Sequence, residues 1–250
     1  MLNIIPISAF QDNYIWLIEN GTYAVIVDPG EAEPVITSLK QRGLKLSTIL
    51  ITHHHADHIG GVNRLITAFS PQVFAPAKEH YAFNHTSVSE GQIIHIKELD
   101  IAFQVIDVGG HTLGHVAYYG VNSIFCGDTL FGGGCGRLFE GTAEQMFASL
   151  QKIAKLPPDT AVYCAHEYTE HNLQFAKTVE KNNPNLIERI STSRKLREAN
   201  LPTIPSAIKL ELATNPFLRC NSPEIIRTLG LESGNEIEVF SLLRQMRNHF

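Results

Sequence analysis

The chain has 250 residues, of which 44% are hydrophobic and 18% are charged, and its formal net charge is −5. This composition is typical of a globular protein whose core needs no disulfides, and the acidic balance argues against a general nucleic-acid binder. The four cysteines lack CxxC spacing, the N-terminal segment lacks the regions of a signal peptide, and no apolar run reaches the roughly 18 residues of a membrane span. We therefore expect a cytoplasmic protein without a membrane or nucleic-acid partner. We also expect a monomer, although nothing in the composition decides the oligomeric state.

Short segments rich in Val, Ile, Phe and Tyr, separated by turns, predict strands along the first part of the chain. Helical patterns lie between some of them, and the last of these follows Thr142, a residue type that caps helices. The expected strands are 3–8, 14–19, 23–28, 48–52, 73–75, 93–96, 102–108, 116–119, 123–126 and 161–164, and the expected helices are 33–42, 59–68 and 143–155.

After Glu167 the pattern becomes helical throughout, with Pro- or Gly-bearing turns between the helices. This shift predicts an α/β catalytic domain over residues 1–168, followed by a small all-α domain over residues 169–250. The expected helices of the second domain are 170–182, 185–200, 206–213, 223–229 and 236–249.

The segment THHHADHIGG, residues 52–61, is the most informative part of the sequence. A buried strand is expected to end at Thr52, and in extended backbone residues i and i+2 point the same way, so His53 and His55 can bind one metal ion together. His54 then points away. Asp57 and His58 follow at the turn into the next helix and can face a second ion.

Three later segments each place one further metal-ligand type at the end of a strand. His111 stands in GGHTLGH, Asp128 in GDT, and His166 after the strand that ends at Cys164. The carboxyl ends of strands are where α/β proteins gather their chemistry.

The candidate ligands divide into two sets that share one carboxylate. His53, His55 and His111 make one site, Asp57, His58 and His166 make the other, and Asp128 bridges both, with room for a shared water. Imidazole and carboxylate donors suit zinc first, with iron or manganese also compatible. Seven N/O ligands exceed what a structural zinc needs, so the set favours a catalytic centre over a chance histidine-rich loop or a non-catalytic metal scaffold.

These motifs, in this order, resemble the metallo-β-lactamase superfamily and, within it, the hydroxyacylglutathione hydrolases, also called glyoxalase II. The superfamily resemblance implies an α/β fold, a four-layer αββα sandwich, here followed by the small all-α domain. The narrower resemblance rests on DNY (12–14), GCGRLFEGT (134–142), HEYT (166–169), PTIPS (202–206), NPFLR (215–219) and RQMRNHF (244–250).

The resemblance implies hydrolysis of S-D-lactoylglutathione to D-lactate and glutathione, a step of methylglyoxal detoxification. It further implies that Arg137, Tyr168, Arg244 and Arg247 form the glutathione site, and guanidinium groups do bind carboxylates well. The chain differs from the usual family pattern at four positions. Family members often carry lysine where this chain has Arg137 and Arg247, aspartate where it has Asn248, and in some cases tyrosine where it has Phe139. These departures concern substrate affinity and contact geometry.

For the mechanism, we expect a metal-activated water to attack the thioester carbonyl, oriented by Asp57 and Asp128 as the catalytic carboxylates. Among hydrolases of the same superfamily, the absent signal peptide argues against a secreted β-lactamase, and the acidic charge argues against a nuclease. The full ligand set argues against a mono-iron persulfide dioxygenase. A lactonase remains the alternative, because only the C-terminal arginines and the helical domain distinguish a glutathione thioester hydrolase from it.

Overall fold

The computed structural model describes residues 2–232 and 235–250, and the chain divides into two compact units. The first unit comprises Met1–Asp107 and Thr112–Gly127, and the second comprises Val108–His111 and Asp128–Phe250. This division by packing differs from the expected domain boundary between residues 168 and 169, which stays a prediction. Over the described residues, no helix combines the length and the apolar character that a membrane span requires.

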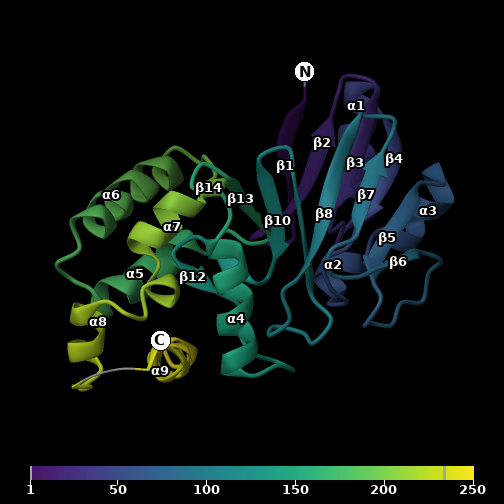
Figure 1. Ribbon diagram of the computed structural model, residues 1–250. Coiled ribbons are helices and arrows are strands. Elements are labelled where there is room, and N and C mark those ends of the chain that lie inside the picture. Colours follow the sequence, from purple (N-terminus) through teal and green to yellow (C-terminus); the bar gives the residue numbers. More distant parts are fainter. Residues whose placement is uncertain (1, 233–234) are drawn as a thin grey trace. The chain divides into compact units, whose positions relative to one another are not determined.

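The first unit contains a mixed sheet of six strands in the order β1-β2-β3-β4-β5-β6 (Figure 1). The first three strands are antiparallel, and β3 to β6 run parallel to one another. Parallel neighbours need crossover connections, and α1 lies in the connection from β3 to β4, whereas α2 and α3 lie in the connection from β4 to β5. The bounds are β1 Asn3–Ala9, β2 Asn13–Glu19, β3 Tyr23–Val27, α1 Ala32–Arg42, β4 Lys45–Leu50, α2 Ala56–Ile59, α3 Val62–Phe69, β5 Gln72–Pro76 and β6 Thr86–Val88.

The same unit holds an antiparallel meander of β7 (Ile93–Ile96), β8 (Ile101–Asp107), β9 (Val116–Gly120) and β10 (Ser123–Gly127). Alternate apolar residues of the mixed sheet pack under α1 and α3, where Leu17, Ile26 and Ile49 meet Val35 and Leu39. All seven residues of β2 are buried, so both faces of the mixed sheet are covered at this strand. The fixed geometry at the carboxyl end of β4 therefore rests on a well-packed core.

The second unit is mainly helical. Its core gathers aromatic rings from α4, α5, η1 and α9, where Phe175 lies 6.1 Å from Phe217, and Phe240 lies 5.7 Å from Phe217 and 5.9 Å from Phe147. The bounds are β11 Leu130–Phe131, β12 Gly134–Cys135, α4 Ala143–Ala154, β13 Ala161–Cys164, α5 Thr169–Val179, α6 Pro184–Glu198, β14 Ser206–Ala207, α7 Ile208–Thr214, η1 Pro216–Leu218, α8 Pro223–Thr228 and α9 Glu236–Asn248.

Local sequence explains several helix ends. Thr142 and Gln145 form a capping box at the start of α4, as the sequence predicts for Thr142. Asn183 accepts hydrogen bonds from the first backbone N–H groups of α6, whose first residue is Pro184. Asn235 caps α9 in the same way.

The structure corrects two expected helices. The helix expected over 59–68 is instead the two helices α2 and α3, because Gly61 N–H donates to the carbonyl of Pro29 at 2.8 Å and interrupts the helical run. Asp57 and His58 consequently lie inside α2, not at a turn before a helix. The segment expected as helix over 206–213 begins with the short strand β14, in which Ser206 pairs with Val162. Strands of two residues have no periodicity from which to predict them.

Candidate metal and substrate-binding sites

The first unit gathers four of the expected metal ligands directly after β4. His53 is fully buried, and its Nε2 lies 3.1 Å from Nδ1 of His55. The ring of His58 lies 4.0 Å from that of His53, and Nε2 of His58 lies 3.5 Å from a carboxylate oxygen of Asp57. The expected convergence of residues i and i+2 is thus observed for His53 and His55, and α2 brings Asp57 and His58 to the same place.

Asp28, which follows β3, forms hydrogen bonds with Thr52 and His58 and so stabilises this cluster. Its carboxylate accepts hydrogen bonds from the backbone N–H of Thr52 (2.8 Å), the hydroxyl of Thr52 (2.7 Å) and Nδ1 of His58 (3.0 Å). Because a carboxylate accepts, Nδ1 of His58 carries a hydrogen, which leaves Nε2 as the nitrogen that can bind a metal ion. This Nε2 lies toward a carboxylate oxygen of Asp57, so the two atoms are placed to bind one ion together.

His54 turns to other partners, as its position in the alternation predicts. Its Nδ1 lies 3.3 Å from Glu79, a buried carboxylate that also accepts hydrogen bonds from the hydroxyls of Tyr81 and Thr112. His115 is fully buried and stacks on His53 at 4.5 Å. Both residues therefore contact the ligand cluster from outside. The contact of Glu79 with His54 could not be predicted from the sequence, because it joins distant segments.

The second unit gathers the other three expected ligands. One carboxylate oxygen of Asp128 lies 3.4 Å from Nε2 of His111, and the other lies 3.5 Å from Nε2 of His166. Nδ1 of His111 donates to the carbonyl of Arg137 at 2.8 Å, so Nε2 presents its lone pair to Asp128. Gly136 makes this approach possible, because a Cβ there would lie 1.9 Å from the carbonyl oxygen of Asp128.

The donor spacings fit a metal ion. Ligand atoms about 2.0–2.1 Å from a tetrahedral zinc ion lie about 3.3 Å from one another. The ring nitrogens and carboxylate oxygens described above lie 3.1–3.5 Å apart within each unit. Buried or half-buried imidazole and carboxylate donors at these spacings suit a divalent metal ion.

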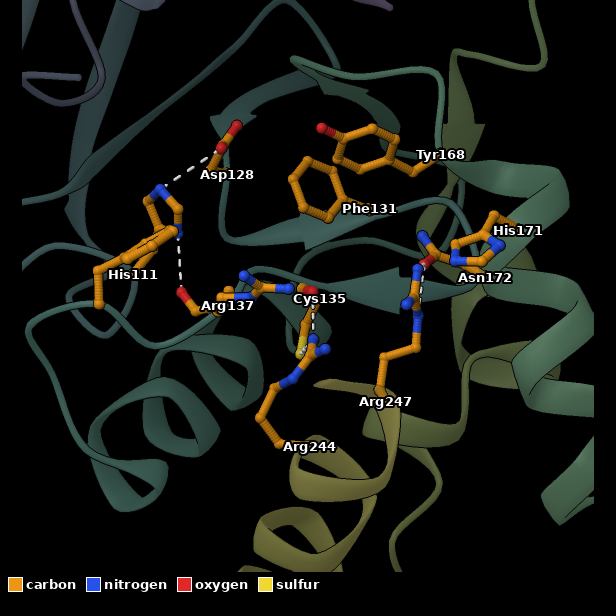
Figure 2. Close-up of a pocket in the computed structure, with 11 residues that line it drawn as sticks. His111, Asp128, Phe131, Cys135, Arg137, Tyr168, His171, Asn172, Arg244 and Arg247 are labelled. Atoms are coloured by element: carbon orange, nitrogen blue, oxygen red, sulfur yellow. Dashed lines mark hydrogen bonds and ion pairs between the residues drawn. The ribbon is translucent and has the colours of Figure 1, made fainter. Parts of the chain in front are cut away.

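A cavity of about 410 Å³ adjoins Asp128 and His111 in the second unit (Figure 2). Three guanidinium groups and two imidazoles line it, whereas Asp128 is the one carboxylate among the lining residues, so the cavity suits an anionic ligand. The lining residues are His111, Asp128, Phe131, Cys135, Arg137, Phe139, Tyr168, His171, Asn172, Arg244 and Arg247.

The four residues expected to bind substrate all line this cavity, but their surroundings differ. Arg244 is 6% exposed, and its Nη1 donates to the carbonyls of Cys135 (2.8 Å) and Gly136 (3.4 Å). Arg247 is partly exposed, and burial lowers its pKa first, followed by the charge of Arg244. The ring of Tyr168 lines the cavity and stacks on His166 at 4.7 Å and 8°.

A buried polar network holds the hairpin of β11 and β12 that forms one wall. Glu211 accepts the N–H of Gly133 at 2.9 Å, and Asn215 donates to the carbonyl of Gly134 at 2.9 Å. Arg189, itself buried, neutralises Glu211. In the sequence, NPFLR is informative only as a motif that resembles the family, and the structure shows that its Asn215 holds one wall of the cavity in place.

All four cysteines are buried as free thiols and fill space as small apolar residues. Burial raises the pKa of the Cys164 thiol to about 12. It also raises the pKa of Cys135, although Arg244 and Arg247 act in the opposite direction. These thiols therefore stay protonated near neutral pH.

The chain is similar to known proteins along its whole length. The model of the metallo-beta-lactamase superfamily matches residues 10–166, and the model described as hydroxyacylglutathione hydrolase C-terminus matches residues 167–250. A hydroxyacylglutathione hydrolase of Methylobacillus flagellatus is 54% identical over 250 residues, which cover 100% of both chains.

Solved structures show the same likeness. A B3 metallo-beta-lactamase, BLEG-1, has a TM-score of 0.65 and 28% identity, over 87% of this chain and 99% of its own. A protein crystallised in a di-iron-bound form has a TM-score of 0.62 and 26% identity, over 86% of this chain and 100% of its own. Together with the superfamily match, these structures confirm the expected α/β fold class.

Proposed function

Because the chain belongs to the hydroxyacylglutathione hydrolase family within the metallo-β-lactamase superfamily, we propose that it is a thioester hydrolase acting on S-2-hydroxyacylglutathione. With S-D-lactoylglutathione as substrate, the products are D-lactate and glutathione, and the reaction serves methylglyoxal detoxification.

One observation of the structure carries this proposal. The cavity that reaches His111 and Asp128 at one end is lined by Arg137, Arg244 and Arg247. An S-acylglutathione brings two carboxylates and a thioester to such a site, so guanidinium groups can bind the peptide while the acyl group lies toward the metal donors. A cavity for a neutral lactone would have no need of three guanidinium groups, and for this reason we rank lactonase activity second.

We further propose that His53, His55, Asp57, His58, His111, Asp128 and His166 together hold two divalent metal ions, zinc first, with iron or manganese as substitutes. The proposal that all seven serve one centre rests on the sequence spacing and on family membership, with the donor geometry inside each unit in support. When bound, such ions supply a Lewis acid and a water that is acidic near neutral pH.

The chain's own residues have three further tasks in this mechanism. Asp57 and Asp128 accept hydrogen bonds from the attacking water and orient it toward the thioester carbonyl. Arg137, Tyr168, Arg244 and Arg247 hold the glutathione portion away from the bond that breaks. The leaving group is the glutathione thiolate, which needs little help from an acid because a thiol has a pKa of about 8.5.

The test is hydrolysis of S-D-lactoylglutathione, a simple lactone and a β-lactam by one purified preparation, with metal analysis of the same sample. We expect fast thioester hydrolysis, about two metal ions per chain and complete loss of activity after chelation. Full activity with a single ion would contradict the two-metal centre, and preferred hydrolysis of the lactone would make the second candidate the function.

The remaining expectations are proposals as well. We propose a cytoplasmic monomer that binds no nucleic acid and no membrane, with a catalytic domain over residues 1–168 and a substrate-binding domain over residues 169–250. Gel filtration with light scattering tests the monomer directly.

A further inference from the structure

Asn172 stands at the centre of a short chain of hydrogen bonds between α5, the β11–β12 hairpin and α9. It is only 4% exposed, and its amide nitrogen donates to the carbonyl of Gly132 at 3.1 Å. Its amide oxygen accepts two hydrogen bonds from one guanidinium group, that of Arg247, from Nε at 3.3 Å and from Nη2 at 3.1 Å. Figure 2 shows Arg247 reaching up from α9 to this amide.

The orientation of the Asn172 amide is fixed by its neighbours. The carbonyl of Gly132 can only accept, so the NH2 group must face it and the oxygen must face Arg247. The amide is also wedged against the hairpin, because a Cβ at Gly134 would lie 2.5 Å from its Cγ and Nδ2. A rotation that exchanged oxygen and nitrogen would bring two acceptors together and two donors together.

The two arginines of α9 are therefore used differently. Nη1 of Arg244 donates to backbone carbonyls of the hairpin, and its guanidinium lies over the ring of Phe217 at 5.2 Å. Arg247 binds Asn172 through Nε and Nη2, so its Nη1 is not engaged in these bonds. The partly exposed Arg247 lines the cavity with the side of its guanidinium opposite Asn172 available to an anion.

We infer that Asn172 is a positioning residue for substrate binding: it fixes the guanidinium of Arg247 in the orientation in which that group meets a carboxylate of the glutathione portion. The inference rests on the proposed function. Without Asn172, Arg247 would have several side-chain conformations to lose on binding, which weakens binding by roughly 2- to 10-fold. Asn172 touches neither the metal donors nor the scissile bond, so turnover of bound substrate is unaffected.

The experiment is a double-mutant cycle on the metal-loaded protein, with Asn172→Ala, Arg247→Ala and the double variant. Steady-state kinetics with S-D-lactoylglutathione give KM and kcat, and calorimetry gives the Kd of glutathione. We expect Asn172→Ala to raise KM and Kd several-fold while kcat stays within about twofold. In the Arg247→Ala background the same substitution has almost no further effect, because its effect passes through Arg247.

A purely structural role for Asn172 would give another pattern. Equal losses in kcat and kcat/KM, or additive effects of Asn172→Ala and Arg247→Ala, would overturn the inference. The matched control is Asn183→Ala, a buried asparagine of the same unit that caps α6 and does not line the cavity. It should lower the unfolding temperature and leave KM unchanged.

A second variant covers the case in which Asn172→Ala does not fold. Asn172→Asp has the same size, keeps an acceptor toward Arg247 and places a negative charge that competes with the substrate for this guanidinium. We expect a larger rise in KM than for alanine, with kcat retained, and an unchanged KM would overturn the inference. A wild-type protein that neither hydrolyses the thioester nor binds glutathione would instead remove the proposed function and this inference with it.

Discussion

Asp28 binds Nδ1 of His58 at 3.0 Å across 30 residues of sequence, and through this bond it determines which nitrogen of that imidazole faces Asp57. The same carboxylate binds the hydroxyl and the backbone N–H of Thr52, directly before His53. Asp28 has a φ of 51°, a left-handed conformation that aspartate and asparagine adopt more readily than most residues. One carboxylate thus connects the end of β3 to two parts of the ligand cluster.

We predict that Asp28→Asn lowers metal affinity about 10- to 100-fold while the protein stays folded. Asparagine tolerates the left-handed backbone, but it cannot accept all three hydrogen bonds, so His58 loses its fixed orientation. Competition with a coloured chelator measures the affinity, and circular dichroism checks the fold. Asp159→Asn, at an exposed position, is the control. Wild-type affinity in Asp28→Asn would mean that His58 needs no such partner.

We predict that His54→Ala retains most of the bound metal, whereas His53→Ala and His55→Ala lose it. His54 turns to Glu79, while His53 and His55 bring their ring nitrogens within 3.1 Å of each other. Metal content per chain after gel filtration is the measurement. Equal loss in all three variants would show that the alternation along the strand end does not decide which imidazoles bind metal.

We predict that Arg189→Met lowers the free energy of unfolding by about 3–5 kcal/mol, because it leaves the buried carboxylate of Glu211 without its cation. Urea denaturation followed by fluorescence measures the loss. The control is Lys209→Met, which removes an ion pair with Asp159 on the surface and should cost less than about 1 kcal/mol. Similar losses of unfolding free energy in both variants would contradict the expectation that the buried ion pair matters more than the exposed one.

We predict that the imidazole of His171 titrates below its ordinary pKa of 6.5. Burial lowers this pKa first, and then the charge of Arg247, which faces it from α9; the ring of Phe250 is its other neighbour. NMR titration, with His171→Asn to assign the signal, measures it. The pKa should rise in Arg247→Ala and on addition of glutathione, whose carboxylates favour the protonated ring.

The lowered pKa of His171 also has a consequence for folding. The folded state binds fewer protons than the unfolded state, so the stabilising contribution is present above pH 6.5 and is lost as the pH falls through the folded pKa. His171 is largely exposed, so this effect on stability should be small. A pKa above 6.5 in the wild type would contradict the influence of Arg247.

Much of the fold could be predicted because its signals are local. The expected strands all occur, apolar residues in β2 and β4 form part of the core, and Thr142 caps α4 as its residue type indicates. Short strands such as β14 could not be predicted, since two residues show no period and their pairing depends on a distant partner.

The sequence by itself determined which donors stand close together along the chain, because His53, His55, Asp57 and His58 lie within six residues after a buried strand. The helix α2, which holds Asp57 and His58, was not expected there. Only the tertiary structure decided which residues form hydrogen bonds or ion pairs with the residues of the site. Three contacts illustrate this. Glu79 lies 25 residues after His54 (79 − 54), Glu211 lies 78 residues after Gly133 (211 − 133), and Arg247 lies 75 residues after Asn172 (247 − 172). Hydrogen bonds over such separations depend on how elements pack, and no local pattern of residues encodes that packing.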